Sequence, residues 1–103
     1  MNLIAEIRRK VADGQFVLSR HATDQSLKRG ISVSEVLEAL STGEVIEDYP
    51  DDKYGPSCLI FGISAGGRPL HIQCSYPSRP TLKFITVYEP DPALWIEFRL
   101  RKR

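Results

Sequence analysis

The segment at residues 19–40, which reads SRHATDQSLKRGISVSEVLEAL, predicts two helices that meet at a sharp corner, and the rest of the chain is arranged around them. Gly30 lies at the corner, where its tolerance of the left-handed conformation ends the first helix. Ser32 follows as an N-cap, and Glu35 stands three residues further on. This spacing is a capping box, in which the hydroxyl and the carboxylate satisfy backbone amides that have no partner inside the helix. We therefore expect a well-defined start for the second helix.

The two predicted helices differ in composition. Ser19 is an N-cap for the first helix, which ends at Arg29 and offers only Ala22 and Leu27 for burial. Its polar face must therefore meet solvent, a ligand or a partner. The second helix, at residues 33–42, carries a conventional apolar stripe. The stripe consists of Val33, Val36, Leu37 and Leu40.

The sequence outside this pair of helices predicts one more helix and then strands. Residues 3–12 are typical of an amphipathic helix, and residues 16–18 are an apolar run that is either a strand or a buried connection. Strands are predicted at residues 44–49, 57–63, 70–76 and 82–88. The third of these alternates, with His71, Gln73 and Ser75 on one face, and the fourth is strongly apolar, as expected for a central strand. Asp91-Pro92 opens a final helical turn, in which Trp95 packs back on the core. This order indicates an α+β fold, with N-terminal helices packed on one face of a three- to four-stranded antiparallel sheet.

Length and charge limit the function classes. The 103 residues predict a single domain, 1–103, that ends in a basic tail at residues 96–103. The net charge of +1 is not that of a strongly basic nucleic-acid protein, although a basic tail can contact phosphates. Five carboxylates form an acidic belt in the middle of the chain. They are Glu44, Glu47, Asp48, Asp51 and Asp52. No apolar run is long enough to span a bilayer, and no secretory signal is recognisable, so we expect a cytoplasmic protein without membrane association.

The cysteines and histidines do not predict a metal centre or a cofactor site. Cys58 and Cys74 lie in neighbouring predicted strands, where they form either a cross-strand disulfide or, as we expect, two reduced and buried thiols. His21 and His71, together with these cysteines, lack the close-paired spacing of zinc ligands. Glycine-rich phosphate loops, GxSxG and HExxH motifs are absent from the sequence. We therefore expect neither a metal ion nor another cofactor.

The remaining polar residues suit cleavage of RNA without a metal. That reaction needs a base for the 2′-hydroxyl, an acid for the leaving oxygen and cations for the charged phosphorane. Histidine suits proton transfer near neutral pH, and arginine binds phosphate oxygens in a bidentate manner. The catalytic candidates are His21, His71 and Tyr88, and the RNA-binding candidates are Arg20, Lys28, Arg29 and Arg79.

Each candidate also has a purely structural interpretation. His21 can simply hydrogen-bond a backbone group at the start of its helix. His71 can be a solvated strand residue, and Tyr88 can pack in the core with its hydroxyl at the rim. Arg29 can complement the dipole at a helix end.

Several motifs together resemble one family. They are His21-Ala22, Arg29-Gly30-Ile31-Ser32, the run GEVIEDYP at residues 43–50, GRPLH at residues 67–71 and ITVYEPD at residues 85–91. The chain over residues 15–95 is similar to a bacterial and archaeal family of small uncharacterised domains. Members of that family look like the toxins of toxin–antitoxin pairs, so the resemblance implies an antitoxin partner of the YgiT-type zinc-finger class.

A more distant resemblance leads to MqsR, an mRNA interferase with a RelE-like fold. The sequence Ala12-Asp13-Gly14-Gln15 after an amphipathic helix is similar to the MqsR layout, which implies a RelE-like toxin fold and ribonuclease activity. Glu89 stands where MqsR-type enzymes carry a lysine, so no catalytic residue is carried over from them.

Two hypotheses follow. In the first, the chain is the toxin of a type II toxin–antitoxin pair and a metal-independent endoribonuclease that acts on mRNA. In the second, it is a non-catalytic interaction module whose polar helix and acidic belt dock a partner protein. The near-neutral net charge favours the second hypothesis, and the polar helix together with the family resemblance favours the first.

Overall fold

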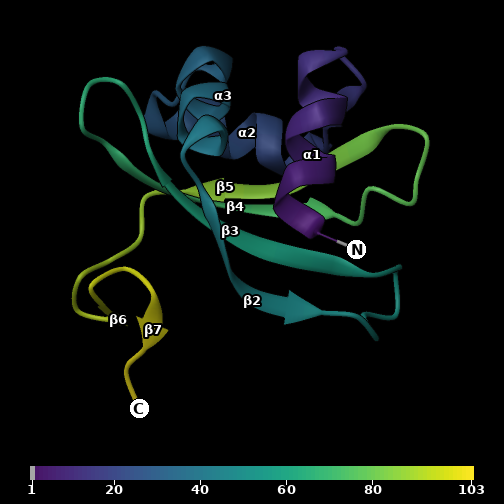
Figure 1. The fold of residues 1–103 in the computed structure, drawn as a ribbon. Coiled ribbons are helices and arrows are strands. Elements are labelled where there is room, and N and C mark those ends of the chain that lie inside the picture. Colours follow the sequence, from purple (N-terminus) through teal and green to yellow (C-terminus); the bar gives the residue numbers. More distant parts are fainter. Residues whose placement is uncertain (1) are drawn as a thin grey trace.

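Three helices lie together on one side of a sheet, and a short strand pair lies on its other side (Figure 1). The computed structural model describes residues 2–103. The helices are α1 (Leu3–Ala12), α2 (Arg20–Arg29) and α3 (Val33–Ser41). The strands are β1 (Phe16–Leu18), β2 (Glu44–Tyr49), β3 (Ser57–Ile63), β4 (Pro69–Ser75), β5 (Leu82–Tyr88), β6 (Trp95–Ile96) and β7 (Leu100–Arg101). The α+β class and the layer of helices agree with the prediction.

The caps of α2 and α3 are those that the sequence predicts. The Ser19 hydroxyl accepts a hydrogen bond from the backbone amide of Ala22 at 3.0 Å, and Gly30 ends α2 with a φ of 62°. At the start of α3 the Glu35 amide donates to the Ser32 hydroxyl at 3.1 Å, and the Ser32 amide donates to the Glu35 carboxylate at 3.0 Å. Both partners of the capping box are therefore in place.

The sheet is larger than predicted and is mixed. Its order is β1-β5-β4-β3-β2, and β1 runs parallel to β5 while the other neighbours are antiparallel. The predicted three- to four-stranded antiparallel sheet is therefore wrong. β1 has only three residues, too few to show an alternation, and it is held from its ends. The Leu82 amide donates to the Gln15 carbonyl, and the Ser19 amide donates to the Phe84 carbonyl, both at 2.9 Å.

Helix α2 protects the part of β5 that β1 does not reach. The Ser19 hydroxyl donates to the Ile85 carbonyl at 2.8 Å, and the Val87 amide donates to the Gln25 side-chain oxygen at 3.0 Å. Backbone groups on a strand edge otherwise need another strand or water. Two polar side chains, from the cap and the body of α2, thus have a structural function at this edge.

The core lies between the helices and the sheet. Fully buried apolar side chains come from all of these layers, and Phe84 of β5 stacks on Phe16 of β1 with ring centroids 5.2 Å apart. Helix α3 approaches β3 closely at Gly62, where a Cβ atom would overlap the backbone carbonyl of Ala39. Val33, which the sequence places in the buried stripe of α3, is 45% exposed. No helix within residues 2–103 has the length and apolarity needed to cross a membrane.

The end of the chain forms a two-stranded ribbon of β6 and β7, which we call the C-terminal ribbon. The predicted helical turn around Trp95 is wrong, since Trp95 starts β6. Trp95 is buried, at 5% exposure, but it packs against His71 on the face opposite the helices and not in the core between helices and sheet. The turn of the ribbon places Glu97 and Phe98 at φ values of 50° and 62°. Left-handed conformations are rare for such residues, so the sequence shows no glycine signal there.

The basic tail is therefore part of the fold. Arg99 pairs with Glu44, and Arg101 pairs with Glu47 at 2.9 Å. The two guanidinium groups also stack over the rings of Phe61 and Trp95, with 4.8 Å and 4.7 Å between the guanidinium carbon and the ring centroid. The ribbon thus neutralises two carboxylates of the acidic belt that the sequence suggested as a docking surface.

Candidate functional site

His71 lies on the side of the sheet that faces the C-terminal ribbon. Its side chain is fully buried, and its ring meets the Trp95 ring edge-on with centroids 4.5 Å apart. Nε2 is 2.6 Å from the Phe98 carbonyl oxygen, to which it can only donate, and Nδ1 is 3.1 Å from the Tyr88 hydroxyl. A neutral imidazole that donates from Nε2 and accepts from Tyr88 at Nδ1 satisfies both contacts.

Burial fixes the charge state of this histidine. Loss of water around the ring lowers the pKa of His71, although the Phe98 carbonyl and Glu47 act in the opposite direction. Burial likewise raises the pKa of Tyr88. The pair is therefore a neutral hydroxyl hydrogen-bonded to a neutral imidazole at physiological pH. The interpretation of His71 as a solvated strand residue is wrong, because the C-terminal ribbon covers it.

Tyr88 opens into a pocket of about 480 Å³, which we call the Tyr88 pocket. It lies between the end of α2, β5 and the C-terminal ribbon. Its lining consists of Gln25, Arg29, Thr86, Tyr88, Glu89, Asp91, Leu94, Trp95 and Arg101. Glu89 pairs with Arg68 at 3.1 Å, and Arg101 pairs with Glu47. The Arg29 guanidinium has no hydrogen bond or ion pair within residues 2–103, so it is the cation available to a ligand here.

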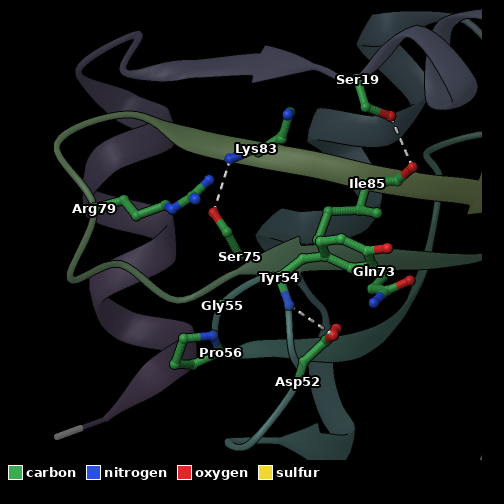
Figure 2. Close-up of a pocket in the computed structure, with 10 residues that line it drawn as sticks. All are labelled: Ser19, Asp52, Tyr54, Gly55, Pro56, Gln73, Ser75, Arg79, Lys83 and Ile85. Atoms are coloured by element: carbon green, nitrogen blue, oxygen red, sulfur yellow. Dashed lines mark hydrogen bonds between the residues drawn. The ribbon is translucent and has the colours of Figure 1, made fainter.

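A second pocket of about 470 Å³ lies further along the same face (Figure 2). We call it the Arg79 pocket. It is lined by Ser19, Asp52, Tyr54, Gly55, Pro56, Gln73, Ser75, Arg79, Lys83 and Ile85. The two pockets meet at a hydrogen bond of 3.1 Å from the Thr86 hydroxyl to the Gln73 side-chain oxygen. We call this strip, from Arg79 to Tyr88, the open face.

The structure brings together only some of the predicted site residues. His71, Tyr88 and Arg29 gather around the Tyr88 pocket, and Arg79 lies in the Arg79 pocket. The other three candidates are exposed on α2 and line neither pocket. They are Arg20, His21 and Lys28. His21 has no hydrogen bond to His71 within residues 2–103, and the two histidines belong to different elements, one exposed and one buried.

Sequence reasoning missed several residues of the open face. Gln73, Ser75 and Lys83 face the pockets, and the loop between β2 and β3 adds Tyr54. The alternation along β4 already placed Gln73 and Ser75 beside His71 on one face. The sequence therefore indicated that Gln73 and Ser75 belong to this face. No pattern in the sequence indicated that the loop would place Tyr54 there.

The two cysteines face each other across β3 and β4 and are both free and buried. Burial raises the pKa of Cys58 to about 12 and also raises that of Cys74. Neither thiol is therefore a nucleophile at neutral pH. Within residues 2–103, no group of three or more histidine, cysteine, aspartate or glutamate side chains is placed to hold a metal ion.

Comparison with known proteins places the chain in a family. No curated protein and no solved structure matches it. A family model described as a domain of unknown function, DUF4258, matches residues 18–89, which is well over half of the chain. The matched region runs from the end of β1 through β5 and includes His71, Tyr88 and the strands of the open face. The chain therefore belongs to the DUF4258 family.

Proposed function

We propose that this chain is the toxin of a type II toxin–antitoxin pair and cleaves single-stranded RNA on the open face without a metal. The observation that carries the proposal is the Tyr88 hydroxyl, which contacts the buried neutral His71 and lines a pocket together with Arg29. A hydroxyl that is hydrogen-bonded to a neutral imidazole can accept a proton while its own proton passes to the imidazole, so no phenolate has to form. The nearby guanidinium of Arg29 suits a phosphate.

The chemistry follows from this pair. Tyr88 takes the proton of the RNA 2′-hydroxyl while its own proton moves to Nδ1 of His71. The 2′-oxygen attacks the phosphorus, the bond to the 5′-oxygen breaks, and that oxygen leaves with a proton from water in the open pocket. The imidazolium that forms keeps its hydrogen bond to the Phe98 carbonyl, and Glu47 favours its charge, whereas burial and Arg101 oppose it. Arg29 offsets the charge that develops on the phosphate oxygens.

The proposed partner follows from the family resemblance. A toxin of this kind requires an antitoxin, and the resemblance suggests one of the YgiT zinc-finger class. Co-expression of that partner would then relieve toxicity.

Growth of a bacterial host provides the test. We expect induction of the chain to arrest growth and to degrade cellular mRNA. Tyr88→Phe should relieve both effects because it removes the accepting oxygen. Tyr76→Phe is the matched control, since its hydroxyl binds Asp48 and lines neither pocket. Unimpaired growth with intact RNA, or equal arrest by the two variants, would refute the nuclease proposal. If His21→Ala relieves the growth arrest and Tyr88→Phe does not, the catalytic base is His21 on α2 and not Tyr88.

A non-catalytic interaction module is the second candidate. It is favoured by Leu27, which is 78% exposed on the otherwise polar α2. The acidic belt supports it less, because Glu44 and Glu47 are already paired inside the chain. Loss of a co-purifying partner in Leu27→Asp, together with intact RNA, would favour this function over cleavage.

A further inference from the structure

The Arg79 pocket is built by two connections and the sheet between them. The loop from β2 to β3 provides Tyr54 and Gly55, the turn from β4 to β5 provides Arg79, and the strands provide the floor (Figure 2). The guanidinium of Arg79 reaches across to the loop, where one of its nitrogens would lie 3.8 Å from a Cβ atom on Gly55. The exposed arginine therefore lies close to the loop, at the edge of the pocket that it lines.

The charges of this pocket are unbalanced. Arg79 and Lys83 line it together, and within residues 2–103 neither side chain has a hydrogen bond or an ion pair. The five ion pairs in that part of the chain use other cations, namely Arg9, Arg68, Arg99 and Arg101. Asp52 is the single carboxylate of the lining, and it already accepts from the Tyr54 amide and the Ser57 hydroxyl, both at 3.3 Å. Two cations against one carboxylate leave the lining with a net positive charge, which favours an anionic ligand.

The floor of the pocket adds a hydroxyl donor. Ser75 is only 3% exposed, and its oxygen accepts from the Lys83 amide at 2.9 Å. Its own hydrogen has no acceptor within residues 2–103. Ser75 can therefore donate to an oxygen of a ligand that lies between Arg79 and Lys83.

An aromatic ring stands at the rim of the pocket. Tyr54 is 80% exposed, and its ring extends from the loop toward Gln73 (Figure 2). Hydrogen bonds from the Tyr54 and Gly55 amides to Asp52 fix the loop that carries it. Large exposed aromatic rings beside cations are the platforms on which unpaired bases stack.

We propose that the Arg79 pocket binds one nucleotide unit of single-stranded RNA, with the phosphate on Arg79, Lys83 and Ser75 and the base on Tyr54. The identification of the ligand as RNA rests on the proposed function. An RNA strand that is bound in the Arg79 pocket would continue past Gln73 and Thr86 to the proposed cleavage site in the Tyr88 pocket. An inorganic phosphate shares the charge of this ligand but not its base, so Tyr54 distinguishes the two.

Fluorescence anisotropy with a 2′-O-methyl oligonucleotide tests the site, because this RNA cannot be cleaved and binding is measured apart from catalysis. We expect the double variant Arg79→Gln with Lys83→Gln to weaken binding by roughly tenfold or more. The slope of log affinity against log salt should fall by roughly 0.7 for each phosphate that is no longer neutralised. Tyr54→Ala should weaken binding by about tenfold, and Tyr54→Phe should restore it. Arg9→Gln, which removes one exposed positive charge on α1 where the double variant removes two, is the control for a general effect of charge.

Two results would overturn the site. One is unchanged affinity of the double variant at an unchanged unfolding temperature. The other is displacement of the oligonucleotide by inorganic phosphate as readily as by a nucleoside monophosphate, together with full binding by Tyr54→Ala. Neither result concerns Tyr88, so this inference and the proposed function fail separately. Normal RNA binding with no cleavage would overturn only the latter.

Discussion

The two faces of the sheet solve different physical problems. The face toward the helices is apolar, with fully buried Ile60, Ile72 and Phe84 from three neighbouring strands. The opposite face buries polar groups, and His71 is as inaccessible there as Phe84 is in the core. Within residues 2–103, the Ser26 hydroxyl is the one buried side-chain polar atom without a hydrogen bond. The face toward the helices thus stabilises the fold, whereas the face toward the C-terminal ribbon holds polar groups in fixed positions. A binding or catalytic site needs such fixed polar groups.

Truncation on the helix face should have the largest effect. We expect Phe84→Ala to lower the free energy of unfolding by about 3–5 kcal/mol. The substitution removes the ring that stacks on Phe16 and leaves a cavity in the core between the helices and the sheet. Urea denaturation measures the change. Lys83→Ala, the exposed neighbour, should stay within about 0.5 kcal/mol. A loss below about 1 kcal/mol for Phe84→Ala would mean that this face is not the principal core.

Removal of the buried imidazole should have an intermediate effect. His71→Leu should cost about 1–3 kcal/mol at pH 7, because the Phe98 carbonyl and the Tyr88 hydroxyl both lose their partner. His21→Leu, at the other histidine of the chain, should cost less than about 0.5 kcal/mol. Equal costs for the two substitutions would show that the ribbon does not depend on His71.

The same histidine predicts a pH dependence with a definite sign. Because the pKa of His71 is lowered from its ordinary 6.5 in the folded chain, the unfolded chain binds the proton more readily. The free energy of unfolding should therefore fall as the pH decreases below about 6.5, and His71→Leu should abolish this part of the profile. Chemical denaturation between about pH 5 and 7 measures it, with His21→Leu as the control. A wild-type profile identical to that of His71→Leu would contradict the assigned neutral state.

The exposed ion pairs of the ribbon should have the smallest effect. Arg99 and Glu44 are about half exposed, at 49% and 51%, so Arg99→Gln should cost less than about 1 kcal/mol. The substitution should loosen the ribbon locally, since it also removes the guanidinium from the Phe61 ring. Hydrogen exchange of the amides in β6 and β7 measures this loosening. A loss of unfolding free energy above about 2 kcal/mol would contradict this prediction, because it would mean that the exposed pair contributes as much as a buried core residue.

The sequence predicted the helix layer well because its signals are local. The caps at Ser19, Gly30 and Ser32 act within a few residues, and all three are confirmed. β1 was ambiguous, because its three residues become a strand only through pairing with β5, far along the chain. The ribbon was missed since its turn uses Glu97 and Phe98 in left-handed conformations instead of glycine.

The candidate site was only partly predictable for the same reason. Alternation along β4 placed His71 and Gln73 on one face, but it could not show that a distant segment covers that face. The polar surface of α2 suggested a site at Arg20 and His21, yet the structure uses Ser19 and Gln25 of that region to complete the edge of β5. Long-range contacts, not local patterns, decided these positions.

The most direct measurement of the division between the two faces is a map of where RNA binds. Isotope-labelled protein is titrated with the 2′-O-methyl oligonucleotide while amide NMR shifts are followed. We predict that the shifts concentrate at Gln73, Ser75 and residues 83–88 and leave α1 and α3 unchanged. Shifts concentrated on α1 and α3, or none at all at saturating RNA, would contradict the assignment of the open face as the functional surface.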